Sequence, residues 1–199
     1  MDVRDRALQA SCPTVAMPSF GPLYSLEQGQ RMVLGRNGLF LQFKNPWLEC
    51  SVAVGRLDPC MRLPYGEVRE EVGFAFGVVP LPLLEEFISH GRDACPRETA
   101  GALIYNVTTA ALTLRMHEIL EASAAHVRYR IPELADDELL AVDLHTHGRS
   151  RAFFSKTDDD DDVGVRVCGV FGNLDRATPS ACFRLIVNGV KVPMASPWE

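Results

Sequence analysis

The apolar residues of this chain fall into short runs separated by turn signals, and this pattern constrains the fold more than any other feature. Residues 39–43, 101–107 and 139–144 are such runs. They have the length of buried strands, whereas buried helices need longer runs. The clearest helical periodicity lies at residues 80–90, and Gly91 is placed to end that helix. The pattern therefore predicts an α/β fold.

Residues 1–72 differ in pattern from the rest of the chain, and we predict a small β-rich N-terminal extension there. Residues 1–30 are expected to be irregular because they carry several prolines and lack periodicity. Asn37-Gly38 predicts a hairpin turn, and alternation in residues 47–54 predicts a half-buried strand. Residues 57–72 are interpreted as a linker, and residues 73–199 as the main domain. At 199 residues the chain has room for one well-cored domain with an appendage.

Charge and cysteine usage exclude several classes of function. A formal net charge of −6 argues against nonspecific nucleic-acid binding, which needs a basic surface. No apolar run approaches the roughly 18–20 residues that cross a bilayer. The N-terminus lacks the apolar core of a secretory signal, and six scattered cysteines without a CxxC pair are typical of reduced thiols. We therefore expect a cytoplasmic protein with no nucleic-acid or membrane partner.

The residues that carry chemistry lie between positions 143 and 158. His145 and His147 end an apolar run, and strand alternation places both imidazoles on one face, with backbones ~7 Å apart. Two such nitrogens can bind one metal ion, but two histidines in ordinary hydrogen bonds would give the same pattern. Asp143 lies on the same face, as a candidate to orient His145 or as a surface carboxylate.

A second motif, Ser155-x-x-Asp158, lies seven residues further along the chain. Two imidazoles and a carboxylate form the ligand set of an open catalytic zinc site. The same residues also match a helix capping box, and the two interpretations are compatible. The run of aspartates at 158–162 is expected to be mostly solvated, and composition alone does not select the ligand among them.

The spacing from His145 to Asp158 resembles the JAMM signature of the MPN/JAB zinc metalloprotease family. That family also has a glutamate upstream, at the start of a strand after the first core helix. The resemblance selects Glu98, in the context Glu-x-x-Gly101, over other glutamates that the residues alone leave open. Thr146 and Gly148 depart from the common serine and proline and affect the loop rather than the ligands.

The resemblance covers roughly residues 73–195 and implies an MPN/JAB-like mixed curved sheet flanked by helices. It implies one Zn²⁺ per chain held by His145, His147 and Asp158. Glu98 would act as general base and then general acid, and Ser155 would stabilise the oxyanion.

The implied activity is a zinc-dependent peptidase or isopeptidase acting at the C-terminus of a ubiquitin-like protein or its conjugate. An E1-like activating enzyme is a further implied partner. The size and the extension are also similar to the A proteins of plasmid-associated PRTRC systems. A catalytically silent MPN-fold scaffold is the main alternative. A zinc deaminase is disfavoured because the chain lacks its H-x-E and PCxxC motifs. A metal-dependent barrel is disfavoured because most of the chain precedes the histidines.

Overall fold

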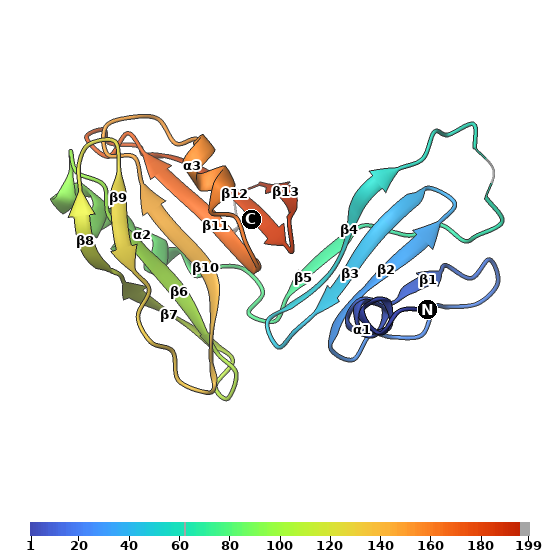
Figure 1. Ribbon diagram of the computed structural model, residues 1–199. Coiled ribbons are helices and arrows are strands. Elements are labelled where there is room, and N and C mark those ends of the chain that lie inside the picture. The colour runs from blue at the N-terminus through green and yellow to red at the C-terminus, as the bar shows by residue number, and fades with distance from the viewer. Residues whose placement is uncertain (62, 196–199) are drawn as a thin grey trace. The chain divides into compact units, whose positions relative to one another are not determined.

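The computed structural model describes residues 1–61 and 63–195 and divides into two compact units, Met1–Ala75 and Phe76–Glu199 (Figure 1). Both units consist mostly of β-sheet, and the described part of the chain contains three helices. The fold is therefore mixed α/β with strands in the majority. None of the described helices is long and apolar enough to cross a membrane.

The first unit is built on a five-stranded sheet with strand order β1-β2-β3-β4-β5. Its strands are β1 (Thr14–Ala16), β2 (Gly29–Gly35), β3 (Gly38–Lys44), β4 (Leu48–Arg56) and β5 (Glu71–Phe74). The β1–β2 pair is parallel and the other pairs are antiparallel. Val33, Phe40 and Val68 form a buried core cluster. The interpretation of residues 57–72 as a linker is therefore wrong for the C-terminal part of this segment, because Val68 enters the core and β5 begins at Glu71.

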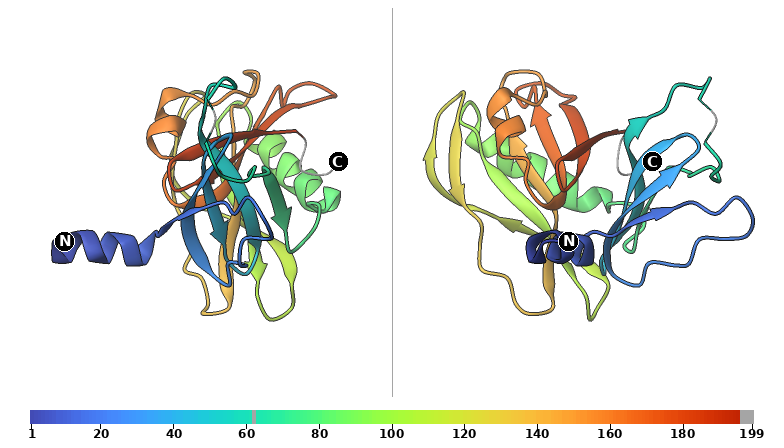
Figure 2. Two further views of the ribbon diagram at one scale, coloured as in Figure 1. Left: turned by 90° about the vertical axis from the view of Figure 1, so that its right-hand side faces the viewer. Right: turned by 45° about the vertical axis from the view of Figure 1, so that its right-hand side comes forward.

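Two local expectations in this unit need correction. Residues 1–30 are not all irregular, because helix α1 (Val3–Ser11) begins after the N-cap Asp2 and strand β1 comes after it. Helix α1 buries none of its residues and projects away from the strands (Figure 2). The predicted hairpin is present, but its turn residues are Arg36 and Asn37. Gly38 instead begins β3 with φ 153°, where an added Cβ would lie 2.3 Å from the Gly55 carbonyl oxygen.

The second unit carries a six-stranded sheet with order β13-β12-β11-β10-β6-β7, and a separate β8–β9 hairpin. The strands are β6 (Ala100–Asn106), β7 (Ala111–Met116), β8 (Glu118–Ala122), β9 (Val127–Arg130), β10 (Glu138–Thr146), β11 (Val165–Gly172), β12 (Ser180–Val187) and β13 (Val190–Met194). Strand β10 is central, antiparallel to β6 and parallel to β11. The sheet is thus mixed, and the C-terminal end of β10 carries His145, with His147 directly after the strand.

Helix α2 (Leu81–Ala94) packs on this sheet through an apolar stripe. Leu84 and Phe87 are fully buried, and the Phe87 ring lies 5.7 Å from that of Phe171 on β11. The helix runs past Gly91, so the prediction that Gly91 ends it is wrong. An added Cβ there would lie 2.8 Å from the Leu174 side chain and 3.1 Å from that of Thr146. Glycine at this position allows α2 to approach the end of β10 closely.

Candidate metal centre

The end of β10 directs two histidines to one face of the sheet. Thr146 faces α2, where its methyl group meets Gly91. Because side chains alternate along a strand, His145 and His147 point to the opposite face. Their Nε2 atoms lie 3.2 Å apart, and the rings meet at 50°. The alternation expected from the sequence thus brings the two imidazoles together.

Asp158 reaches the histidines from helix α3 (Lys156–Asp160). Its Oδ1 lies 3.2 Å from His145 Nε2. Its Oδ2 accepts a hydrogen bond from the Ser155 amide at 2.6 Å, and its own amide donates to Ser155 Oγ at 3.2 Å. One carboxylate therefore completes a capping box and faces the imidazoles at once. Each of the three residues offers a ligand atom within 4.8 Å of the others.

The protonation of these groups fits a bound divalent cation. Burial lowers the pKa of His145, although the Asp158 carboxylate opposes that shift. Burial and then the neighbouring His145 lower the pKa of His147. Both rings are therefore neutral near pH 7, and zinc binds neutral imidazole nitrogens and carboxylate oxygens. The donor set suits zinc better than magnesium, which prefers oxygen ligands.

Backbone contacts with the C-terminal end of β10 hold Glu98 beside the two histidines and Asp158. The Thr146 amide donates to the Thr99 carbonyl at 3.0 Å, and the Thr99 amide donates to Thr146 Oγ1 at 2.9 Å. The Glu98 amide donates to the Ser123 carbonyl at 2.8 Å. Glu98 itself is 7% exposed and lines the same cavity, of about 230 Å³, as His145, His147, Ser155 and Asp158. The structure thus brings all five residues to one cavity.

The electrostatic setting of Glu98 suits proton transfer. Burial, together with the nearby Asp158 carboxylate, raises the pKa of Glu98 to about 7. A carboxyl with a pKa near the operating pH can both accept and return a proton. A solvated carboxyl, with a pKa of about 4, would be a weak acid catalyst at neutral pH.

The loop after the histidines explains why residue 148 is glycine and not the proline that is common in the JAMM signature. The φ of Gly148 is 49°, which lies outside the range that proline can adopt. An added Cβ would lie 2.5 Å from the Pro96 carbonyl oxygen. The Gly148 carbonyl also accepts a hydrogen bond from the Leu174 amide at 2.9 Å. Glycine therefore lets this loop pack against the segment that leads to Glu98.

Asp143 lines the cavity, and its described hydrogen-bond and ion-pair partners are His117, Tyr129 and Arg166. Its Oδ1 lies 3.3 Å from His117 Nε2, its Oδ2 accepts from the Tyr129 hydroxyl at 3.4 Å, and Arg166 Nε lies 3.8 Å away. Burial, with the negative charge of Asp143, raises the pKa of Tyr129. No sequence pattern singles out His117 or Tyr129, since neither has ligand-like spacing. Asp143 therefore connects the cavity wall to His117, Tyr129 and Arg166.

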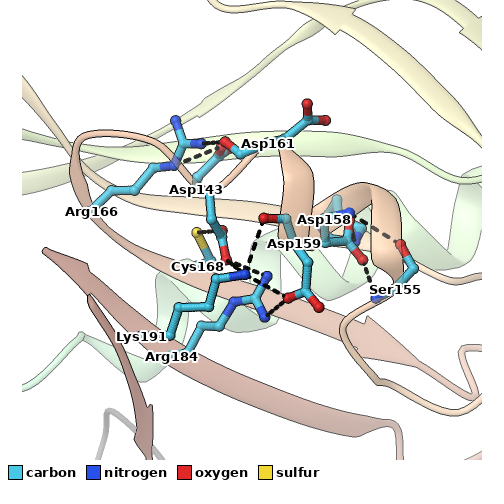
Figure 3. Close-up of polar contacts among 11 residues, drawn as sticks. Asp143, Ser155, Asp158, Asp159, Asp161, Arg166, Cys168, Arg184 and Lys191 are labelled. Carbon is cyan, nitrogen blue, oxygen red and sulfur yellow. Dashed lines mark hydrogen bonds and ion pairs between the residues drawn. The ribbon is translucent and has the colours of Figure 1, made fainter. Parts of the chain in front are cut away.

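The aspartates after Asp158 are more structured than a solvated run. Asp162 is buried, and Asp159 pairs with basic side chains from β12 and β13 (Figure 3). The expectation that this run is mostly solvated holds for Asp159, Asp160 and Asp161, which are exposed, and is wrong for Asp162. Sequence reasoning misses Arg184, the main partner of Asp159 and Asp162, because a contact between residues 25 positions apart leaves no local pattern.

Comparisons with known proteins agree with this division of the chain. Residues 80–186, which are 107 of the 199, match the family described as prokaryotic homologs of the JAB domain. Residues 2–75 match a domain of unknown function, DUF2016. No curated protein sequence matches the chain. The solution structure of a protein from Desulfitobacterium hafniense is similar over 57% of this chain and 86% of its own, with 15% identity and a TM-score of 0.42.

The first match spans more than half of the chain and contains the histidine, aspartate and glutamate positions described above. The chain therefore belongs to the family of prokaryotic homologs of the JAB domain.

Proposed function

We propose that this protein is a zinc-dependent peptidase or isopeptidase of the JAMM type. The observation that carries the proposal is the convergence of His145, His147 and Asp158 in one cavity with Glu98. Three protein ligands with an open position are typical of catalytic zinc sites, whereas structural sites use four. The raised pKa of Glu98 gives the cavity an acid–base group matched to neutral pH.

His145, His147 and Asp158 would hold the zinc ion, which supplies Lewis acidity and lowers the pKa of water in the site. Glu98 accepts a proton from the attacking water and later delivers a proton to the leaving amine. The amide bond breaks, a carboxylic acid and an amine form, and Glu98 returns to its starting state. The Ser155 hydroxyl, whose oxygen accepts from the Asp158 amide, donates its proton in a hydrogen bond to the developing oxyanion.

The substrate class we propose is the C-terminal tail of a ubiquitin-like protein, either as a precursor extension or as an isopeptide to lysine. The resemblance to JAMM proteins and to the PRTRC A proteins supports this choice, and an E1-like enzyme would belong to the same system. A cavity of about 230 Å³ admits an extended segment but no folded domain. The six cysteines are free thiols, which supports a cytoplasmic setting.

The test uses the full chain loaded with zinc and a panel of ubiquitin-like proteins that carry short C-terminal extensions. Wild type should release the extensions, and either a chelator or Glu98→Gln should abolish release while the zinc content of the variant stays unchanged. Equal cleavage by wild type and Glu98→Gln would refute the assigned role of Glu98.

A catalytically silent scaffold is the second candidate, since a JAB-type fold by itself does not establish turnover. It predicts a chain that binds zinc and a ubiquitin-like partner without cleaving any member of the panel. Partner binding in Glu98→Gln should then equal binding in wild type.

A further inference from the structure

Helix α3, which carries the candidate ligand Asp158, has little support of its own. It is five residues long, and none of these residues is buried. A helix this short is unstable in isolation because nucleation is costly. Aspartates are favourable in its first turn but unfavourable at its C-terminal end, where Asp160, Asp161 and Asp162 add negative charge. Some other part of the fold must therefore fix its position.

Arg184 on β12 reaches this segment from the sheet (Figure 3). Its Nη1 donates to Asp159 Oδ1 at 2.6 Å, and its Nη2 lies 2.5 Å from Asp162 Oδ2. The guanidinium carbon lies 3.7 Å from the centroid of the Phe154 ring, just before the N-cap Ser155. Arg184 and Asp162 are both buried, so their pair is shielded from solvent, whereas Asp159 remains exposed. A rigid, planar group thus joins both ends of α3 to the sheet.

Two more basic residues act on the same segment. Lys191 on β13 donates to Asp159 Oδ1 at 2.9 Å and to the Asp159 carbonyl at 3.0 Å. It also lies 3.3 Å from Asp162 Oδ2. Arg166 on β11 donates to the Asp161 carbonyl at 2.6 Å. Three adjacent strands of the sheet therefore hold one short acidic helix.

We propose that Arg184, assisted by Lys191, is a positioning residue that fixes α3 so that the Asp158 carboxylate faces His145 and His147. This inference rests on the proposed zinc site, because it assigns to Arg184 a role in zinc affinity. Without Arg184, only Lys191 would bridge Asp159 and Asp162, and α3 would be held less firmly against the sheet. Asp158 would then contribute less to binding, although no ligand has been removed.

The test is the zinc dissociation constant, measured by competition with a chromogenic chelator, for wild type and Arg184→Gln. We expect the variant to bind zinc on the order of 10-fold more weakly, as is usual when a group that orients a ligand is lost. Arg184→Lys keeps the charge and should recover part of the loss. The matched control is Arg115→Gln, which removes the two-pronged pair with Glu138 at the other end of β10. Zinc affinity of this control should stay within about twofold of wild type.

A second readout monitors α3 without metal. The Asp159 and Asp161 amides donate to the Ser155 and Thr157 carbonyls, each at 3.0 Å, and should resist hydrogen exchange. In apo Arg184→Gln their exchange should accelerate about 10-fold relative to apo Arg115→Gln. If Arg184→Gln does not fold, Lys191→Met, a substitution at an exposed position, should show the same changes in zinc affinity and exchange with smaller amplitude.

Zinc affinity of folded Arg184→Gln within twofold of wild type would overturn the inference. If the wild-type chain bound no zinc, the proposed function would fail, and amide exchange alone would decide whether Arg184 holds α3. Unchanged exchange in that case would overturn the inference as well.

Discussion

Replacing Glu98 with glutamine should stabilise the metal-free protein, and the gain should depend on pH. The pKa of Glu98 is raised from 4.5 to about 7 by burial and then by Asp158. A raised folded-state pKa means that folding favours the protonated carboxyl. The contribution of the protonated Glu98 carboxyl to folding stability is fully present below the unfolded-state pKa, and it is lost as pH rises through about 7. Above that pH the folded chain holds an ionised, poorly solvated carboxylate.

The magnitude is set by these two pKa values. Linkage gives a cost of ionising Glu98 on folding of about 0.8 kcal/mol at pH 5 and about 3.4 kcal/mol at pH 8. Glutamine is neutral at both values and has no such cost. The difference in unfolding free energy between Glu98→Gln and wild type should therefore be about 2.5 kcal/mol larger at pH 8 than at pH 5, within a factor of two.

The assay is urea unfolding of chelator-treated wild type and variant at both pH values. The control is Glu133→Gln, which removes an exposed carboxyl from the same unit and should show no such dependence. Adding zinc should shrink the difference, because a nearby cation favours the ionised carboxylate. A variant-minus-wild-type difference that is equal at pH 5 and pH 8 would refute the electrostatic account of Glu98.

Three further predictions concern single side chains. Gly148→Ala should lower the unfolding free energy by at least about 2 kcal/mol in chemical denaturation, because φ is 49° and the new Cβ would meet the Pro96 carbonyl; an unchanged stability would contradict this. Ser155→Ala should reduce turnover by about 100- to 1000-fold in steady-state assays at saturating zinc, where elemental analysis should still find the metal bound, and full activity would remove Ser155 from the mechanism. Burial raises the pKa of Cys168 to about 12, so iodoacetamide at pH 8 should label exposed Cys60 well before Cys168, as read by mass spectrometry; the reverse order would contradict the burial of Cys168.

The parts of the site that obey local rules can be predicted from the sequence. Strand alternation places His145 and His147 on one face, and a capping box depends only on Ser155 and Asp158. Residues 112–121, whose pattern fits strand or helix, form most of two strands, β7 and β8. The strands predicted at 101–107 and 139–144 are confirmed with shifts of one or two residues.

The parts that depend on long-range packing cannot be predicted in this way. Glu98 lies near the histidines because Ala100 pairs with His145 across β6 and β10, which no local pattern reveals. The resemblance to a family is needed to select it. The same limit explains why the pairing of Arg184 with Asp162 escapes prediction.

Glycine positions show a related limit. Gly91 resembles a helix end in the sequence, yet it serves a close approach between α2 and β10. Gly38 is predicted within a turn, and instead begins a strand that passes close to β4. A glycine in the sequence indicates that a side chain is not tolerated at that position. Only the tertiary structure shows whether the reason is a turn, a helix end or the close approach of another element.

Zinc content tests the proposed metal centre most directly. Wild type and His147→Ala, prepared identically, should be compared by elemental mass spectrometry, with circular dichroism to verify that both are folded. We expect about one zinc per wild-type chain and almost none in the folded variant. Equal zinc content in the two proteins, whether near zero or near one, would contradict a metal centre built on His145, His147 and Asp158.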